Sequence, residues 1–320
     1  MKNLISIWIA LVAAVSAPLV SAQEVTLRAI SAFNEGGDIS EHFERFVKKV
    51  NAEGKGLVQI NFIGGPKAMP PFELGKAIKA GIVDMVYGPG AFYTNVMPEA
   101  LAMTYTTLTA KQQREQGAYE VINQVMGQRM NAHYLARAVD HTPFHIYLNK
   151  KIDRLDLKGL RIRVTPVHQD IVVALGAIPV TLPPGEVYTA LERGLIDGYA
   201  WPLAGIFDLG WQEKTKYRVD PGFYSTEDSV LVNLSKWNSL NKAQKDFLTK
   251  QALWLEGIGD EYFAFNEKEK KRQTAAGIQV LDFSGPQGDT LQKRAMEVGW
   301  ESVLKTSPAT GKMLKEKLGR

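Results

Sequence analysis

The sequence predicts an α/β protein made of two similar lobes, because a short pattern occurs twice and strand-like segments alternate with helix-like ones. Pro70-Pro71-Phe72-Glu73 recurs 113 residues later as Pro183-Pro184-Gly185-Glu186. The residues that follow recur at the same offset: Ala77, Gly81, Asp84 and Pro89 in the first copy, and Ala190, Gly194, Asp197 and Pro202 in the second. Each copy predicts a helix that begins at Pro and ends at Gly, then a short apolar strand. Two such units are expected to present strand ends to a shared crevice, where open α/β sheets bind ligands.

The first 22 residues have the features of a secretory signal peptide. Lys2 gives a positive start, residues 4–15 are mainly apolar, and Val20-Ser21-Ala22 satisfies the small-residue rule for cleavage before Gln23. The apolar run is shorter than the roughly 20 residues that a membrane span needs. Residues 1–22 are therefore expected to be removed, and the mature protein is expected in the periplasm without direct membrane insertion.

Composition excludes several classes of protein. Cysteine is absent from the 320 residues, which excludes disulfides, thiol catalysis and cysteine metal sites. The formal net charge of +4 falls by one when Lys2 is removed. So small an excess does not indicate nucleic acid as a partner.

In the first half of the mature chain, strands and helices are expected to alternate. Asp38 and Glu41 can form a reciprocal cap at the start of a helix, and an apolar stripe at helical spacing follows. The expected elements are a strand at 25–30, a helix from 38 through 50, a strand at 57–63, the first copy of the repeated pattern, a helix at 109–129, and strands at 136–139 and 144–148 near a lobe crossing.

The second half continues the alternation and ends in a long helix. After a strand at 160–164, a helix at 168–175 and the second copy of the pattern, a strand at 229–233 is expected to return to the first lobe. Asn241 and Gln244 predict the cap of a helix that runs to about 276 along both lobes, with a possible kink at 256–260. The predicted division is 23–143 plus 229–267 for lobe I, and 144–228 plus 268–320 for lobe II.

The sequence contains few motifs that indicate an enzyme site. His42, His133, His141, His145 and His168 show no metal-ligand spacing, and the nucleophile elbow, phosphate loop and dinucleotide fingerprint are all missing from the sequence. Glycine-rich stretches such as 64–66 and 88–90 fit plain turns or the close approach of backbone to a ligand.

The sharpest candidate for ligand binding is an arginine pair in the segment 156–164. Arg161 and Arg163 fall on the same face of the expected strand, because side chains alternate with period two. Arg163 is nearer the end of the strand, where it can point into a crevice, and a guanidinium binds a carboxylate through two parallel hydrogen bonds. The alternative for either arginine is a structural salt bridge.

Aromatic residues gather after both copies of the repeated pattern. They are Tyr87, Phe92 and Tyr93 in the first half and Tyr199, Trp201 and Phe207 in the second. Each can pack in a core, and together they can face an apolar or planar ligand across a cleft.

At these residues the chain resembles the periplasmic solute receptors of tripartite ATP-independent (TRAP) transporters. The resemblance covers the mature chain and is carried by Pro98-Glu99-Ala100, by Asp156-Leu157-Lys158-Gly159-Leu160-Arg161-Ile162-Arg163-Val164, and by 186–194 followed by Ile196-Asp197-Gly198. It implies a two-lobed periplasmic-binding-protein fold, with a crossing strand shared between the lobes and a long helix that spans both. It further implies hinge closure on an organic acid, with Arg163 binding the ligand carboxylate, and docking on membrane permease subunits.

The resemblance also narrows the expected ligand. Trp201 stands where sugar-acid receptors carry asparagine, and Phe144 or His145 replaces a second arginine of sialic-acid receptors. Ala200 replaces the glutamate that helps oxo-acid receptors bind a cation, so neither a metal nor a cofactor is expected. Besides Arg163, the candidates for ligand contact are Phe33, Asn34, Glu35, Pro66, Tyr87, Pro89, Phe92, Phe144, Arg161, Trp201 and Tyr224.

The sequence therefore predicts a monomeric receptor that binds an organic acid anion and performs no chemistry. The expected ligand is a monocarboxylate with an apolar or aromatic body. Two alternatives stay open: an exported enzyme using Glu73, Glu186 and His145, and a sensory receptor of the same fold.

Overall fold

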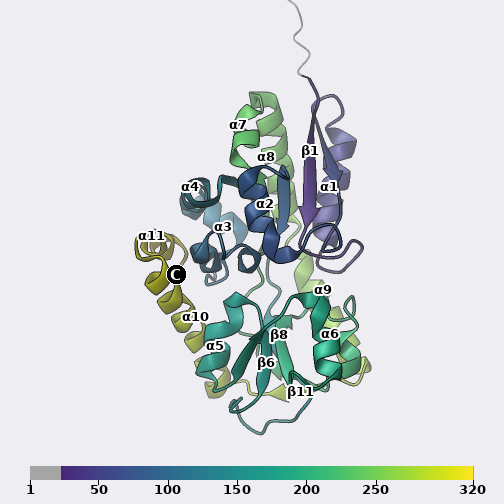
Figure 1. The fold of residues 1–320 in the computed structure, drawn as a ribbon, viewed down its shortest axis with the longest axis vertical. Coiled ribbons are helices and arrows are strands. Elements are labelled where there is room, and N and C mark those ends of the chain that lie inside the picture. The colour runs from purple at the N-terminus through teal and green to yellow at the C-terminus, as the bar shows by residue number, and fades with distance from the viewer. Residues whose placement is uncertain (1–22, 320) are drawn as a thin grey trace, which may run out of the picture.

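The computed structural model describes residues 23–319, which form two α/β lobes, one above the other in Figure 1. The predicted signal peptide, 1–22, lies outside the described residues. Lobe I is built on a five-stranded sheet of order β2-β1-β3-β10-β4, and lobe II on a six-stranded sheet of order β11-β9-β5-β8-β6-β7. The predicted two-lobed α/β fold is confirmed.

The strands of lobe I are β1 (Val25–Ser31), β2 (Val58–Phe62), β3 (Met85–Gly88), β4 (Ala132–Val139) and β10 (Asp228–Asn233). Those of lobe II are β5 (Phe144–Leu148), β6 (Arg161–Val164), β7 (Ile178–Thr181), β8 (Gly198–Pro202), β9 (Tyr217–Asp220) and β11 (Gln279–Asp282). The helices up to the first crossing are α1 (Glu41–Glu53), η1 (Pro71–Glu73), α2 (Leu74–Ala80), η2 (Gly90–Phe92), η3 (Pro98–Met103), α3 (Ala110–Glu115) and α4 (Ala118–Met130). The later helices are α5 (Pro166–Ala174), α6 (Pro184–Glu192), η4 (Trp211–Lys214), α7 (Leu234–Ser239), α8 (Lys242–Gly257), α9 (Glu261–Ala275), α10 (Pro286–Thr306) and α11 (Pro308–Leu318).

The repeated sequence pattern forms the same unit in both lobes. In each copy a helix, α2 or α6, is followed by a glycine in the left-handed region, Gly81 at φ 70° or Gly194 at φ 65°. A strand then runs parallel to the first strand of the unit, β3 beside β1 and β8 beside β6. In both units the parallel strands therefore end at the same edge of their sheet. The two lobes can present these carboxyl ends to each other.

A second shared feature explains why aspartate recurs in the pattern. The Asp84 carboxylate accepts hydrogen bonds from the backbone N–H and the guanidinium of Arg28, at 2.9 and 3.1 Å. In lobe II the Asp197 carboxylate accepts the matching pair from Arg161, both at 3.0 Å. Each aspartate therefore fastens the strand after the helix to the strand before it. By this correspondence Arg161 is the equivalent of Arg28, and Arg163 falls where lobe I has Ile30.

The lobes are joined by two antiparallel segments and not by one shared strand. Residues 140–143 lead from β4 to β5, and 221–227 lead back from β9 to β10. Thr226 N–H donates to Thr142 O at 2.7 Å, and Phe144 N–H donates to Tyr224 O at 2.9 Å. The predicted crossing strand is thus a short two-stranded connection that continues the pairing of β4 with β10.

The long helix predicted over 241–276 is two helices, α8 and α9. The break falls at residues 258–260, within the predicted kink, where Gly257 and Gly259 lower the helical preference. α8 packs on β4 and α1 of lobe I. α9 reaches lobe II, where Gln273 Nε2 donates to Leu203 O at 2.9 Å.

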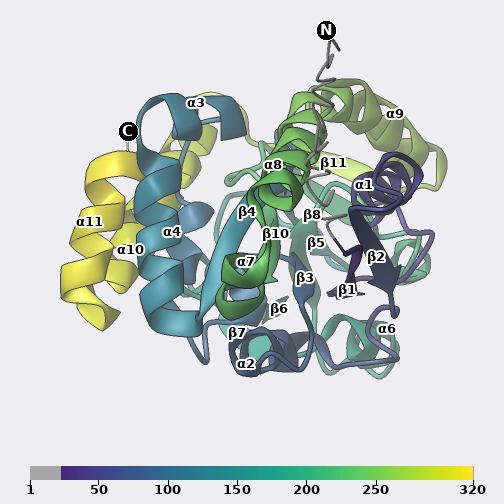
Figure 2. The ribbon, with the colours of Figure 1, turned by 90° about the horizontal axis from the view of Figure 1, so that it is seen from above.

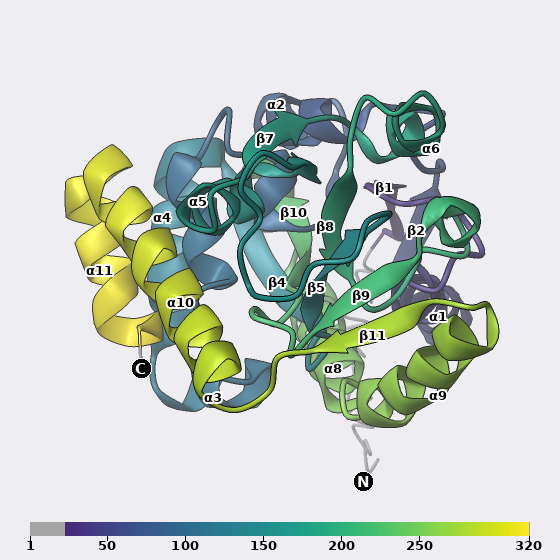
Figure 3. The same cartoon turned by 90° about the horizontal axis from the view of Figure 1, so that it is seen from below.

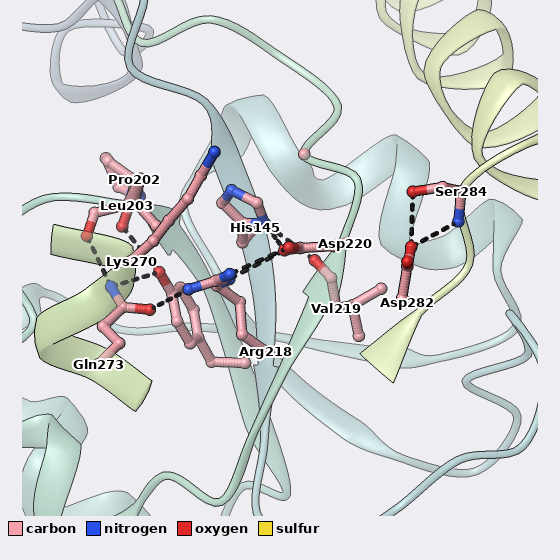
Figure 4. A network of polar contacts seen from close by, with 12 residues as sticks. His145, Pro202, Leu203, Arg218, Val219, Asp220, Lys270, Gln273, Asp282 and Ser284 are labelled. Carbon is pink, nitrogen blue, oxygen red and sulfur yellow. Dashed lines mark hydrogen bonds and ion pairs between the residues drawn. The ribbon is translucent and has the colours of Figure 1, made fainter. Parts of the chain in front are cut away.

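A polar network holds α9 on lobe II (Figure 4). Arg218 donates through Nη1 to Gln273 Oε1 at 3.0 Å and through Nε to Asp220 Oδ1 at 2.8 Å. His145 Nδ1 lies 2.9 Å from the same Asp220 oxygen. Although burial acts to raise it, the hydrogen bonds from His145 and Arg218 hold the pKa of Asp220 well below its usual range. His145 therefore belongs to a buried structural network.

The C-terminal helices α10 and α11 connect the lobes on a second side. Figures 2 and 3 show α11 beside α4 of lobe I, with α10 passing α5 of lobe II. Trp300 Nε1 donates to Tyr105 O at 2.8 Å, and Thr310 Oγ1 donates to Glu99 Oε1 at 2.8 Å. The predicted division places all of 268–320 in lobe II, whereas these contacts place α11 on lobe I. Residues of both lobes consequently share one hydrophobic core.

Candidate functional site

The main cavity lies between the lobes and has a volume of about 290 Å³. Lobe I lines it with the loop after β1 and with the loop before η1, and lobe II with the start of α6, the end of β8 and the loop after β8. The lining residues are Ala32, Phe33, Asn34, Gly37, Ile39, Ser40, Pro66, Pro70, Pro71, Pro183, Pro184, Gly185, Glu186, Trp201, Gly205, Asp208 and Leu209. Both copies of the repeated Pro-Pro pattern therefore line the cavity.

A smaller inner pocket of about 20 Å³ adjoins this cavity on the side of the lobe crossings. It shares Phe33 and Trp201 with the main cavity, so the two spaces are neighbours. Its other lining residues are Pro89, Ala91, Phe92, Thr104, Phe144, Thr165, Val167, His168, Pro202, Thr226, Glu227 and Asp228. Apolar and aromatic side chains dominate both spaces, with few polar groups among them, which is typical of small-molecule sites.

Arg163 is fully buried beside the lining residue Trp201, and among residues 23–319 it has no anionic partner. Its Nε and Nη2 donate to Leu182 O at 2.9 and 2.7 Å, and its Nη1 has no hydrogen-bond partner. The guanidinium carbon lies 5.2 Å from the ring centroid of Trp201, which lines both spaces. Burial lowers the pKa of Arg163 to about 9. Buried charges in proteins are normally paired, so this guanidinium is suited to an anionic ligand.

Arg161, on the same strand, is bound elsewhere. Its Nε and Nη2 donate to the Asp197 carboxylate at 3.0 and 3.2 Å, and its side chain is 40% exposed. Like Arg163, it is not a lining residue of either space, and it has no contact with Trp201 comparable to that of Arg163. The two arginines that share a strand face therefore differ in their partners: Arg161 binds the Asp197 carboxylate and fastens β6 to β8, whereas Arg163 has only a backbone carbonyl as partner among the described residues.

We expect replacement of Arg161 by Ala to leave ligand affinity within about twofold of wild type, because partly exposed ion pairs contribute little beyond their own site. Titration calorimetry with the tightest-binding organic acid measures this. A tenfold loss of affinity would show instead that Arg161 takes part in binding.

A buried acidic pair lies at the inner pocket, next to the crossings. Glu227 Oε2 accepts from Gly90 N–H at 3.2 Å, and Ser229 Oγ donates to Glu227 Oε1. Burial raises the pKa of Glu227 to about 7. Among residues 23–319, both carboxyl oxygens of Asp228 are buried without a hydrogen-bond partner. Burial together with the charge of Glu227 raises the pKa of Asp228 well above its usual range. Within the described residues, Glu227 is thus hydrogen-bonded, whereas Asp228 presents a carboxyl group with no hydrogen-bond partner at the inner pocket.

The raised pKa of Glu227 predicts that its contribution to stability falls between pH 4.5 and 7. In this window the folded protein keeps a proton that the unfolded chain, with an ordinary glutamate pKa of 4.5, has released. Stability is thus fully present below pH 4.5 and is lost as the pH rises through 7. For each pH we compare the free energy of unfolding of the ligand-free Glu227→Gln variant with that of wild type. We expect the difference, variant minus wild type, to be about 3 kcal/mol larger at pH 8 than at pH 4. Urea unfolding at both pH values measures this, and an equal effect at both would contradict it.

The structure places the remaining predicted contact residues in three groups. Phe33, Asn34, Pro66 and Trp201 line the main cavity, and Pro89, Phe92 and Phe144 line the inner pocket. Glu35 lies at an open depression beside Lys67 and Asp208. Like Glu35, Tyr87 and Tyr224 line neither of these two spaces. The Tyr87 hydroxyl donates to Ile39 O at 2.7 Å, and the Tyr224 hydroxyl donates to Ala295 O at 2.9 Å. These two rings are core residues, because both are buried and their hydroxyls are satisfied by backbone carbonyls.

Several lining residues were not among the predicted contacts. The prolines of the repeated pattern could have been predicted as lining residues, because Pro70-Pro71 and Pro183-Pro184 are the matching parts of the two copies. The sequence around Glu227 and Asp228 gave no signal of a ligand site, since acidic residues ahead of a strand are common.

Among residues 23–319, no group of three or more His, Cys, Asp or Glu side chains is arranged to hold a metal ion. Within that same range, none of the helices combines the length and apolarity needed to cross a membrane.

Two α/β lobes around a largely apolar cleft, with a buried unpaired guanidinium at its wall, define the class of two-lobed solute-binding proteins. The chain belongs to the bacterial extracellular solute-binding protein family 7, whose model matches residues 32–305. The resemblance to the periplasmic receptors of TRAP transporters is thereby confirmed, and the family is one of solute-binding receptors.

Relatives and solved structures agree with this membership. The chain is 27% identical over 275 residues to the monocarboxylate 2-oxoacid-binding periplasmic protein of Nostoc sp. strain PCC 7120, covering 82% of this chain and 75% of that one. It superposes with a TM-score of 0.82 on a TRAP periplasmic solute-binding protein from Desulfovibrio salexigens with bound orotic acid, at 21% identity over 91% of this chain and 96% of that one. A Bordetella pertussis extracytoplasmic solute receptor that binds pyroglutamic acid gives a TM-score of 0.79 at 17% identity, with 92% and 100% of the two chains covered.

Proposed function

We propose that this protein is a periplasmic receptor that binds an organic acid anion between its lobes and delivers it to the membrane permease subunits of a TRAP transporter. The proposed ligand is a monocarboxylate with an apolar or aromatic body, and the proposed receptor works as a monomer after removal of residues 1–22. The observation that carries the proposal is Arg163, whose buried Nη1 has no partner and whose guanidinium lies against Trp201 at the cleft wall.

The character of the cleft supports an apolar ligand body. A micromolar dissociation constant corresponds to about −8 kcal/mol. One charge-assisted hydrogen-bond pair contributes roughly 1.5–3 kcal/mol, so the remainder must come from contact with rings such as Phe33 and Trp201 and from release of water on closure. The names of the relatives support a carboxylic acid, since the Nostoc protein is named for monocarboxylate 2-oxoacids and the two structures for orotic and pyroglutamic acids.

A thermal-shift screen of organic acids followed by calorimetry tests the proposal. We expect at least one monocarboxylate to raise the melting temperature and to bind with micromolar affinity, and to be recovered chemically unchanged. A ligand at 100 times its dissociation constant stabilises a protein by about 2.7 kcal/mol, which such a screen detects. Binding of neutral solutes only would contradict the proposal, and conversion of the acid would favour an enzyme.

A further inference from the structure

Several buried polar atoms around the cleft lack hydrogen-bond partners within residues 23–319. Two of them in the inner pocket, Nε2 of His168 and Oγ1 of Thr226, can donate or accept, whereas those with a fixed role differ in kind between the two lobes. In lobe II they include two donors, Nη1 of Arg163 and Nε1 of Trp201, the latter beside Gly205 of the main cavity. In lobe I they include two acceptors, Oδ1 and Oδ2 of Asp228, which lines the inner pocket together with Trp201. A ligand that satisfies both sets must present acceptor atoms to lobe II and a hydrogen-bond donor to lobe I.

From this arrangement we infer that the ligand is a carboxylic acid that also carries an N–H donor, a ring N–H or an ammonium group, which Asp228 binds while Arg163 binds the carboxylate. The inference rests on the proposed function and names its substrate class more narrowly. Nitrogen is the suitable donor because an N–H group can satisfy a buried carboxyl oxygen, and a cationic N⁺–H group also favours the ionised form of Asp228. A ligand without a donor would leave Asp228 buried and unsatisfied, at a cost of roughly 1–3 kcal/mol.

Charges near Asp228 favour a donor over a second acceptor. The nearest cation, Arg137, is already engaged: its Nη2 lies 3.1 Å from Asp140 Oδ1 and 3.1 Å from Thr226 O. Glu227 adds a second acidic group beside Asp228. The end of the cleft at lobe I is therefore rich in acceptors and acidic groups, and the end at Arg163 is cationic. An acid that binds with its carboxylate at Arg163 and its N–H at Asp228 matches this polarity and contacts both lobes at once.

Calorimetry with two pairs of acids tests the inference on the mature protein. Each pair has nearly the same shape and differs in the donor: pyrrole-2-carboxylate against furan-2-carboxylate, and proline against tetrahydrofuran-2-carboxylate. In at least one pair we expect the N–H acid to bind about tenfold or more tightly than its oxygen analogue. Equal affinities within both pairs would overturn the inference and leave the proposed function intact. Failure of all four acids to bind would overturn the inference if the thermal-shift screen finds another organic acid that binds, and the proposed function would then stand.

Two variants test whether Asp228 causes the preference for the N–H acid over its oxygen analogue. Asp228→Leu keeps a similar volume and removes the acceptor, so the preference for the N–H acid should fall to within about twofold, while the oxygen analogue keeps or gains affinity. Asp228→Asn keeps one acceptor and should retain part of the preference, and it serves where the leucine variant does not fold. A preference that is unchanged in both variants would overturn the assignment to Asp228.

Discussion

Replacing Arg163 with Met is expected to weaken ligand binding by about 100-fold or more and to leave the ligand-free protein as stable as wild type, or more stable. Truncation of one partner in a buried charged hydrogen-bond pair costs roughly 2–5 kcal/mol of binding free energy, and 1.4 kcal/mol is a factor of ten. In the ligand-free protein the same guanidinium is buried with two hydrogen bonds to one carbonyl and no anion. An apolar side chain of similar volume removes that desolvation cost.

The two parts of this expectation are measured separately, by calorimetry with the best organic acid and by urea unfolding without ligand. Arg161→Met is the matched control, because it removes a guanidinium from the same strand face without touching the cleft. Full affinity in Arg163→Met would contradict the role of Arg163. A large loss of stability would show that the guanidinium serves the fold and not the ligand.

Replacing Arg137 with Met is expected to have the largest effect on folding, a loss of about 3–5 kcal/mol in the free energy of unfolding. Arg137 is buried on β4 where the chain first crosses between the lobes, and it pairs with Asp140 at 3.1 Å. Its Nη2 also donates to Thr226 O on the returning segment, at 3.1 Å. The variant leaves Asp140 and the neighbouring acidic pair, Glu227 and Asp228, without a buried cation, and it removes a bond between the two crossing segments.

Urea unfolding at pH 7 measures this loss. Arg294→Met on α10 is the control, since Arg294 is half exposed beside Glu297 and its removal is expected to change stability by less than about 1 kcal/mol. The double variant Arg137→Met with Asp140→Asn should recover part of the loss, because it removes one of the abandoned charges. If the single variant is as stable as the control, the cluster does not depend on Arg137 for its stability.

Most of the architecture was predictable, because local patterns decide the form of the backbone. Proline at the first helical turn and glycine after the last recur in both copies of the pattern, and both form a helix, a left-handed glycine and a strand. The predicted capping pair of Asn241 and Gln244 is present at the start of α8. The break between α8 and α9 was less predictable. Glycine lowers helical preference, but it does not specify whether a helix bends or ends, or in which direction the next helix runs.

The candidate site was predictable only in part. Alternation along a strand places Arg161 and Arg163 on one face, but it does not tell which of them has a carboxylate partner. That partner, Asp197, binds Arg161 and comes from a distant part of the chain. Phe33 and Trp201 both line the cleft, whereas Tyr87 and Tyr224 are buried and line neither space. An aromatic residue has the same preference for burial in a core as in a ligand site, so its sequence position does not decide between them.

Repeated local signals in the chain were enough to predict two lobes of one build and an arginine at a strand end, and the resemblance of its motifs to a known family indicated the class of receptors. The three-dimensional packing alone determined that the Arg163 guanidinium has no anion beside it, that the Asp228 carboxylate has no donor, and that α11 lies on lobe I. The physical reason is that hydrogen-bond satisfaction depends on atoms brought together from distant parts of the chain, whereas helix and strand form depends on neighbours along it.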